Sequence, residues 1–264
     1  MDLKLTSKTA LITGSTAGIG YAIAKSLAAE GAEVYVNGRD QKRIDDAVEK
    51  IVKETGNTNV KGLKADFANI TQIDDLIAQL PSVDILVNNV GIFDPKEFKD
   101  IPDDEWMKFF EVNVLSGVRL SRAYFDNMLL NNWGRIIFIS SESAMQIPAE
   151  MIHYGMTKTA QIAVARGLAE LTVGSNVTVN TVLPGPTASE GVSTFLVSVA
   201  KAQGLTEKQM ETEFFANMRG TSLLKRFLEP EEIANMVTFI ASPLSSATNG
   251  ATLRVDGGVI KTAF

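Results

Sequence analysis

A tyrosine and a lysine four residues apart, Tyr154 and Lys158, are the side chains best placed to transfer a proton. If the segment around them is helical, both side chains lie on one face of the helix. Ser141 precedes Tyr154 by thirteen residues and ends a strand-like run, so it could complete a site. The spacing alone is not specific, because Tyr21 and Lys25 repeat it.

Reduction of a carbonyl group would use these residue types. It requires a hydride for the carbon atom and a proton for the oxygen atom. A tyrosine with a pKa of about 10 is a poor base at neutral pH. An ammonium group about 4 Å away contributes on the order of 4 kcal/mol, comparable to the free energy that brings the tyrosine pKa near neutrality. We therefore expect Lys158 to lower the pKa of Tyr154, and Ser141 to bind the substrate oxygen.

A glycine-rich loop near the N-terminus could bind the phosphates of a cofactor. Gly14, Gly18 and Gly20 follow a strand expected to end at Thr13, and a helix is expected to start near Ile19. Backbone N–H groups at a helix N-terminus carry partial positive charge and bind pyrophosphate. Glycines allow the tight turn and the close approach of phosphate and sheet. The loop therefore indicates a dinucleotide site.

Strand-like and helical patterns alternate along the chain, which is typical of βαβ units and a parallel sheet. Two strand candidates, "DILVNN" and "RIIFIS", are almost continuously apolar, as expected for strands covered on both faces. The expected helices include 19–30, 41–55 and 70–80, and the expected strands are 9–13, 33–37, 60–65, 84–88, 135–140, 178–183 and 252–255.

Composition excludes several classes of protein. The 264 residues are 45% hydrophobic, enough for a large core, and we expect one domain over 1–264. The chain has no cysteine and one histidine, His153, so disulfides, thiolate chemistry and multi-histidine metal sites are excluded, and we expect no metal. The net charge of −6 without a basic run makes nucleic acid a poor partner. Without a leader-like or membrane-length apolar run, we expect a cytoplasmic protein.

The segment 186–229 interrupts the alternation, because it carries no strand pattern. One interpretation is a pair of surface helices. The other is a mobile lid over a substrate pocket, in which the lid continues from the loop after a strand. We favour the lid, because structureless insertions of this length are usually functional or disordered. Its large apolar residues are Phe195, Leu196, Phe214, Phe215 and Met218.

The glycine loop "TGSTAGIG" resembles the T-G-x3-G-x-G loop of the short-chain dehydrogenase/reductase family, and the resemblance covers almost the whole chain. Asn88-Asn89-Val90-Gly91 is similar to the family's N-N-A-G, with valine for alanine. Ser141, Tyr154 and Lys158 match its catalytic serine and Y-x3-K. The further matches are Asn113 in "EVNVLSG", Pro184-Gly185 in "VNTVLPGPT", and "VDGG" at 255–258.

The resemblance implies a Rossmann-type doubly wound parallel sheet of about seven strands with helices on both faces. It implies that Asn113, Ser141, Tyr154 and Lys158 are catalytic, with Lys158 also holding the ribose and Asn113 anchoring a water. It also implies homo-oligomers, tetramers or dimers, formed through helices at about 103–130 and 150–172. The expected cofactor-binding residues are Gly14, Ser15, Gly18, Ile19, Gly20, Asn37, Arg39, Asp66, Phe67, Asn89, Gly91, Tyr154, Lys158, Pro184, Gly185 and Thr187.

The end of the second strand bears on which nicotinamide cofactor binds. NAD-preferring sites usually place Asp or Glu there, against the ribose 2′-hydroxyl. This chain has Gly38 and then Arg39, and arginine can bind a 2′-phosphate. We favour NADP, with NAD as the alternative. Asp66 and Phe67 resemble the family's adenine contacts.

Two neighbouring residues need a separate interpretation. Tyr21 directly follows Gly20, and the residue thirteen before it is Lys8, so we interpret Tyr21 as an ordinary helix residue. His153 precedes Tyr154, but adjacent helical residues diverge by about 100°. We therefore expect a substrate-side or interface histidine rather than a hydrolase base.

The leading hypothesis is an NADP-dependent oxidoreductase acting on a carbonyl or secondary alcohol, more specifically a ketone or 3-oxoacyl reductase. The alternatives are an NAD-dependent alcohol, sugar or steroid dehydrogenase of the same family, or a non-catalytic dinucleotide-binding regulator. The apolar residues of 186–229, with Met145, Ile147 and Met151, favour a substrate of hydrophobic character.

Overall fold

The sheet of this protein is parallel throughout and has the strand order β3-β2-β1-β4-β5-β6-β7. The computed structural model describes residues 1–189, 200 and 204–263. Each strand lies within one residue of its expected bounds, and the Rossmann-type fold is confirmed. The strands are β1 (Thr9–Ile12), β2 (Glu33–Gly38), β3 (Val60–Lys64), β4 (Ile85–Asn88), β5 (Gly134–Ile139), β6 (Val177–Pro184) and β7 (Thr252–Val255).

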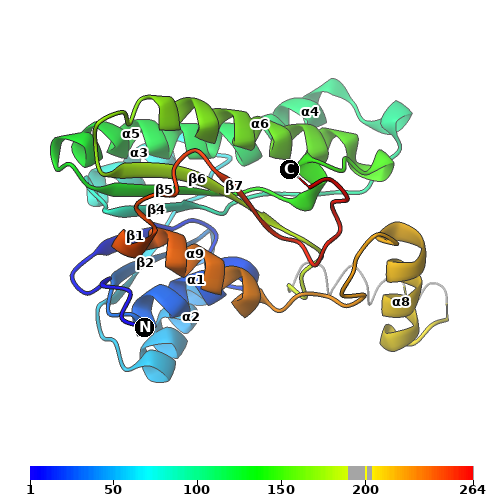
Figure 1. Ribbon diagram of the computed structural model, residues 1–264, viewed down its shortest axis with the longest axis horizontal. Coiled ribbons are helices and arrows are strands. Elements are labelled where there is room, and N and C mark those ends of the chain that lie inside the picture. Colours follow the sequence, from blue (N-terminus) through cyan, green and yellow to red (C-terminus); the bar gives the residue numbers. More distant parts are fainter. Residues whose placement is uncertain (190–199, 201–203, 264) are drawn as a thin grey trace.

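Helices cover both faces of the sheet (Figure 1). One layer contains α1 (Gly18–Ala29), α2 (Gln41–Thr55) and α9 (Pro230–Ala241). The other contains α3 (Ile70–Gln79), α4 (Asp103–Phe110), α5 (Ser116–Leu130) and α6 (Ile152–Glu170). Side chains alternate across each strand, so Ala10 and Ile12 of β1 join the core under α1 and α9, whereas Leu11 joins the opposite core. Both layers therefore hold β1 and the loop that follows it.

Helix α2 shows how local sequence sets the length of an element. Asp40 accepts a hydrogen bond from the backbone N–H of Arg43 and caps the first turn. Gly56 ends the helix in the left-handed conformation, with φ of 73°, which suits glycine. The short connection between β2 and α2 keeps Arg39 at the carboxyl edge of the sheet.

The segment 186–229 leaves the sheet and returns to it. Its two ends pair at a parallel bridge between Thr187 and Leu228. Its described part contains α8 (Glu207–Glu213) and a π-helical turn (Phe214–Met218), which project beyond the carboxyl edge of the sheet (Figure 1). Phe214, Phe215 and Phe227 pack together there. Residues 190–199 and 201–203, including Phe195 and Leu196, lie outside the described residues.

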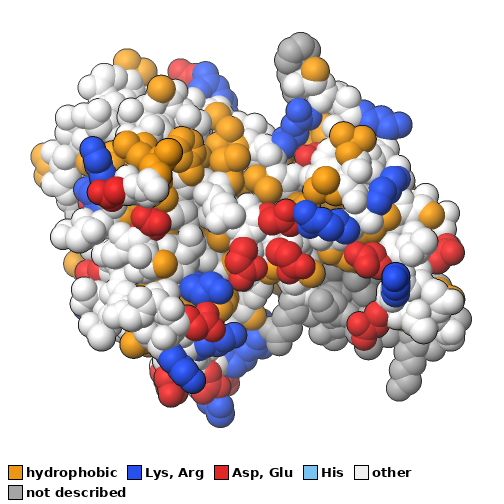
Figure 2. Space-filling model, turned by 60° about the horizontal axis from the view of Figure 1, so that its bottom comes forward, with side chains coloured by type: hydrophobic (Ala, Val, Ile, Leu, Met, Phe, Trp, Pro, Cys, Tyr) orange, Lys and Arg blue, Asp and Glu red, His pale blue; other side chains and the backbone are white. Residues whose placement is uncertain are grey.

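The surface mixes charges of both signs. On the face shown in Figure 2, Lys and Arg side chains are interspersed with Asp and Glu, and the segment that carries α8 forms the right-hand end in both views. Within residues 1–189, 200 and 204–263, no helix is long and apolar enough to cross a membrane.

Candidate active site

The glycine loop lies at the carboxyl end of β1, where the chain order of the sheet reverses between β1 and β4. Open α/β sheets bind ligands at this switch point. Gly14 and Gly18 have φ of 60° and 57°, which residues with a Cβ rarely adopt. No side chain caps the start of α1, and its first turn has no acidic residue. Its N–H groups are therefore left for an anion, and the loop fits a pyrophosphate.

Gly20 is required by close packing. A Cβ added there would lie 2.4 Å from the Gly14 carbonyl oxygen and 2.6 Å from Nδ2 of Asn89. That Asn89 amide donates to the carbonyl oxygens of Thr13 and Gly14, at 2.9 and 3.0 Å, and so fixes the loop from β4. Any side chain at position 20 would push α1 away from the glycine loop.

We expect Gly20→Ala to lower dinucleotide affinity at least tenfold and to destabilise the fold by about 1–3 kcal/mol through overpacking. Gly167→Ala is the matched control, because nothing lies within 4 Å of its added Cβ on α6. That control should bind the cofactor normally and gain about 0.5–1 kcal/mol. Fluorescence titration with NADPH and thermal unfolding would measure both effects. Normal NADPH binding by Gly20→Ala would contradict the role of the glycine loop in binding the cofactor.

Two of the residues expected to contact the cofactor use their side chains to support the loop from behind. Asn37 is buried in β2, where its Oδ1 accepts from the Gly14 N–H at 3.0 Å and its Nδ2 donates to the Leu63 carbonyl. Ser15 is also buried, and its Oγ donates to the Ile12 carbonyl and accepts from the Asn37 N–H. Both side chains hold the loop in shape without lining the cavity.

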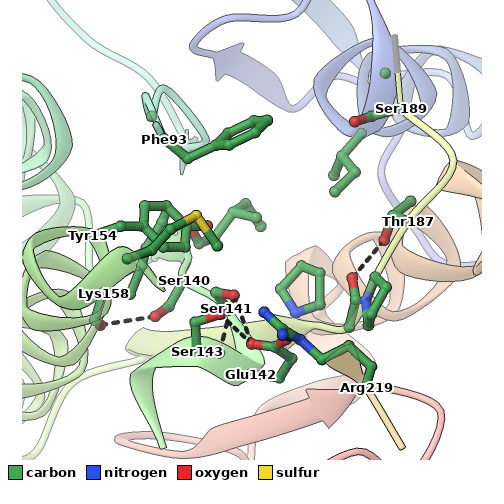
Figure 3. Close-up of a pocket in the computed structure, with 18 of the residues that line it drawn as sticks. Phe93, Ser140, Ser141, Glu142, Ser143, Tyr154, Lys158, Thr187, Ser189 and Arg219 are labelled. Carbon is green, nitrogen blue, oxygen red and sulfur yellow. Dashed lines mark hydrogen bonds and ion pairs between the residues drawn. The ribbon is translucent and has the colours of Figure 1, made fainter. Parts of the chain in front are cut away.

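A cavity of about 370 Å³ opens beside this loop and contains the proposed proton-transfer residues. Ser141 follows β5, and Tyr154 and Lys158 come from α6, so the predicted helical face is observed (Figure 3). The sequence-predicted residues that line the cavity are Gly18, Ile19, Gly20, Asn89, Gly91, Ser141, Tyr154, Lys158, Pro184, Gly185 and Thr187.

The pKa values of the Tyr–Lys pair differ from the expectation. Burial raises the pKa of Tyr154 to about 12, although the neighbouring Ser141 hydroxyl acts to lower it. Burial lowers the pKa of Lys158 to about 7. Lys158 Nζ lies 5.6 Å from the Tyr154 ring centroid and donates to the Ile139 carbonyl at 2.9 Å. The pKa of Tyr154 is therefore raised rather than lowered as expected, because desolvation of the hydroxyl outweighs the neighbouring charges in this arrangement.

Asn113 connects these residues to the neighbouring helix. It lies in a π-helical turn (Glu111–Leu115) between α4 and α5, and such turns are frequent at functional sites. Its Nδ2 donates to the Ile92 carbonyl and to Thr157 Oγ1, at 2.9 and 3.0 Å. Its carbonyl accepts from Gln161 Nε2, and Gln161 Oε1 accepts from Lys158 Nζ. Asn113 is thus one step from Lys158 but does not line the cavity.

The structure also shows a buried ion pair that the sequence did not indicate. Arg219, just after the π-helical turn of the 186–229 segment, donates from Nε to Glu142 Oε1 at 2.7 Å. Glu142 directly follows Ser141, and both members of the pair line the cavity (Figure 3). Burial disfavours the Arg219 charge, but Glu142 and Glu150 outweigh it and raise the Arg219 pKa. The only sequence signal was a carboxylate in "ISSES" beside the candidate serine.

The predicted adenosine contacts lie outside the cavity. Arg39 is exposed just after β2, next to Gly38, which the Thr16 side chain of the glycine loop approaches. Asp66 is partly buried and accepts from the Ala68 N–H. Phe67 packs in the core, so its side chain supports this edge and does not line the cavity.

The structure also places five further residues that the sequence analysis discussed. His153 is 0% exposed and packs against Phe109 at 4.0 Å between ring centroids, so the expected substrate-side or interface position is wrong. Tyr21 pairs with Glu54 on the outer side of α1, as interpreted. Of the apolar residues near the site, Met151 lines the cavity, whereas Met145 and Ile147 are half exposed and do not.

The strand order, with a glycine loop at the switch point and an uncapped helix start beside it, defines a dinucleotide-binding α/β protein. Comparison with known sequences gives its family. Residues 14–260 match the family described as enoyl-(acyl carrier protein) reductase. The chain belongs to the short-chain dehydrogenase/reductase family and is an oxidoreductase of that family.

Individual relatives agree with this assignment over nearly their full length. The chain is 50% identical to the "Uncharacterized oxidoreductase YvaG" of Bacillus subtilis (strain 168), over 100% of both chains. It is 30% identical to the 3-oxoacyl-[acyl-carrier-protein] reductase FabG of Aquifex aeolicus, covering 98% of this chain and 100% of that one. L-Sorbose reductase of Gluconobacter frateurii, solved with NADPH and L-sorbose, superimposes with a TM-score of 0.93 at 30% identity, covering 99% and 100%.

Proposed function

We propose that this protein is a cytoplasmic NADP(H)-dependent reductase of ketones that also oxidises the corresponding secondary alcohols. The observation that carries the proposal is the meeting of Ser141, Tyr154 and Lys158 with the start of α1 around one cavity. The named substrates of two relatives, 3-oxoacyl groups and L-sorbose, both contain a ketone. Burial raises the pKa of Tyr154, which favours the protonated form that a proton donor in reduction needs.

The chain's own groups account for binding and proton transfer. The N–H groups at the start of α1 would hold the pyrophosphate, and Lys158 would hold the ribose next to the nicotinamide. The cofactor, when bound, supplies the hydride. Ser141 would hold the ketone oxygen and Tyr154 would protonate it. Asn113 would keep the relay in place through Gln161, which accepts from Lys158.

The assay that tests this function follows NADPH consumption with an acetoacetyl thioester, 3-heptanone and 1-hydroxy-2-hexanone. Turnover of at least one ketone supports a reductase. Cofactor binding without turnover of any of them would favour the alternative, a non-catalytic dinucleotide-binding regulator.

The preference for NADP rests on Arg39. At the end of β2, Gly38 leaves no carboxylate that would repel a 2′-phosphate, and the exposed Arg39 guanidinium is next in the chain. A guanidinium binds phosphate through charge-assisted, often bidentate hydrogen bonds. The L-sorbose reductase that superimposes on this chain was solved with NADPH.

We expect Arg39→Asp to weaken NADPH binding tenfold or more, because a charge-assisted hydrogen bond of about 1.5–3 kcal/mol is replaced by repulsion. NADH binding should weaken far less. Arg122→Asp, the same charge change at an exposed position on α5, is the control and should leave both affinities unchanged. Calorimetric titration of each cofactor measures the preference. Equal affinity of the native protein for NADH and NADPH would overturn it.

The 186–229 segment forms part of the proposed substrate site. We infer that this segment covers the substrate, because Thr187, Phe214, Met218 and Arg219 form one wall of the cavity.

We also propose a homo-oligomer, a tetramer or dimer, formed through helices at 103–130 and 150–172. Exposed apolar side chains on these helices, such as Met107 and Leu130, support it.

A further inference from the structure

The carboxylate of Glu142 is a buried charge next to the reaction centre. Its side chain is 5% exposed and that of its partner Arg219 is 10% exposed, yet both line the cavity that holds Ser141 and Tyr154. Figure 3 shows the Glu142 carboxylate between the Arg219 guanidinium and the hydroxyls of Ser141 and Ser143. A buried charge is tolerated only when its hydrogen bonds are satisfied. The donors that reach Glu142 therefore constrain what can bind beside it.

Three donors serve this carboxylate in the structure. Arg219 Nε donates to Oε1 at 2.7 Å, and Ser141 Oγ donates to Oε2 at 3.2 Å. Ser143 Oγ also donates to Oε2. A carboxylate offers about four lone-pair positions, so these donors nearly satisfy it. The second donor is the candidate catalytic serine, whose hydroxyl has a single hydrogen.

Substrate binding changes the number of hydrogen bonds that the Glu142 carboxylate accepts. To hold a ketone oxygen, Ser141 must turn its only hydrogen from Glu142 Oε2 to the substrate. The buried carboxylate then loses one of its donors, which is unfavourable unless the substrate replaces it. A hydroxyl group on the carbon next to the carbonyl can provide the replacement, because the Ser141 hydroxyl that would hold the carbonyl lies 3.2 Å from that carboxylate and both side chains line the cavity. An alkyl group at the same place cannot.

We propose that Glu142 is a specificity-determining residue that accepts a hydrogen bond from a hydroxyl beside the reacting carbonyl, so that the substrate is a neutral α-hydroxyketone. This inference rests on the proposed reductase function and narrows it. It adds a polar requirement to the expectation of a substrate of hydrophobic character, which was drawn from apolar residues near the site.

A carboxylate beside the carbonyl is the substituent that this pocket tolerates least. It has no hydrogen to donate to Glu142, and it brings a like charge close to a buried one. Arg219 does not offset this charge, because it already pairs with Glu142 and, through Nη1 at 3.3 Å, with Glu150. The pocket therefore discriminates by hydrogen bonding and by charge.

The test uses three substrates that share a butyl ketone and differ in one substituent: 1-hydroxy-2-hexanone, 3-heptanone and 2-oxohexanoate. With NADPH, we expect kcat/KM to be about tenfold or more higher for the hydroxyketone than for 3-heptanone, because a hydrogen bond to a charged group is lost. The 2-oxoacid should be the poorest. In Glu142→Gln the preference for the hydroxyl should fall at least severalfold, mainly through KM, and the 2-oxoacid should improve.

A ratio of kcat/KM values for two substrates does not depend on the fraction of folded enzyme, so partial misfolding of the variant cannot imitate the result. Glu170→Gln, an exposed residue paired with Arg166 at the end of α6, is the matched control and should keep the native ratios. Equal use of the hydroxyketone and 3-heptanone, or unchanged ratios in Glu142→Gln, would overturn the inference while the reductase function stands. Failure of every ketone would overturn both.

Discussion

Tyr154→Phe is expected to lower turnover by about 10²–10⁴-fold while NADPH still binds, because the change removes one hydroxyl from a side chain that lines the cavity. The phenyl ring keeps the packing on α6, including the edge contact with Phe93. Lys158 and the start of α1 are unchanged, so the groups assigned to the cofactor remain. Single-turnover kinetics and NADPH titration separate the two effects.

The chain provides an unusually close control in Tyr21→Phe. Tyr21 and Lys25 repeat the Tyr-x3-Lys spacing on α1, but the Tyr21 hydroxyl donates to Glu54 at the surface and the residue lines no part of the cavity. Its removal should leave turnover within about twofold. Near-native turnover by Tyr154→Phe, or an equal loss in both variants, would contradict the assignment of the proton donor.

The sequence predicted the sheet well because the signal there is local. The apolar runs "DILVNN" and "RIIFIS" were predicted to be strands covered on both faces, and they form the central pair β4 and β5. The positions of Tyr154 and Lys158 followed from helical spacing alone. Gly20 followed from the loop pattern, and its close approach to Gly14 shows why that pattern exists.

Long-range features could not be predicted in the same way. Arg219 and Glu142 are 77 positions apart, and no periodicity in 186–229 indicated which side chain would return to the site. Asn37 was predicted as a cofactor contact from its place at the end of the second strand. Its side chain turns inward because the N–H of Gly14 and the carbonyl of Leu63 need partners. The pKa of Lys158 depends on burial, which spacing does not report.

Lys158→Met is expected to stabilise the fold near pH 6 while it abolishes activity. Burial lowers the Lys158 pKa to about 7 from its ordinary 10.5, so the folded protein holds this proton less tightly than the unfolded chain. At about 1.4 kcal/mol per tenfold change in proton affinity, the ammonium costs the native state on the order of a few kcal/mol. Loss of its hydrogen bond to the Ile139 carbonyl offsets about 1 kcal/mol of the gain.

The direction with pH follows from proton binding. Between pH 7 and 10.5 the unfolded chain carries more protons at this site than the native state, so native stability rises with pH in that window. The cost is complete below pH 7 and disappears above 10.5. The advantage of Lys158→Met should therefore be largest near pH 6 and vanish toward pH 10. Thermal unfolding measures it, at about 2–4 °C per kcal/mol for a domain of this size.

The same substitution at Lys25 distinguishes burial from a general effect of removing a charge. Lys25 forms exposed ion pairs with Glu54 and Glu231, so Lys25→Met should be neutral or slightly destabilising at every pH. A pH-independent change in Lys158→Met would show that the buried ammonium is not the source of the cost. If the pH-dependent gain in stability is found, the Lys158 ammonium destabilises the fold at a position where an apolar residue fits. A chemical role then accounts for the presence of Lys158 beside Tyr154.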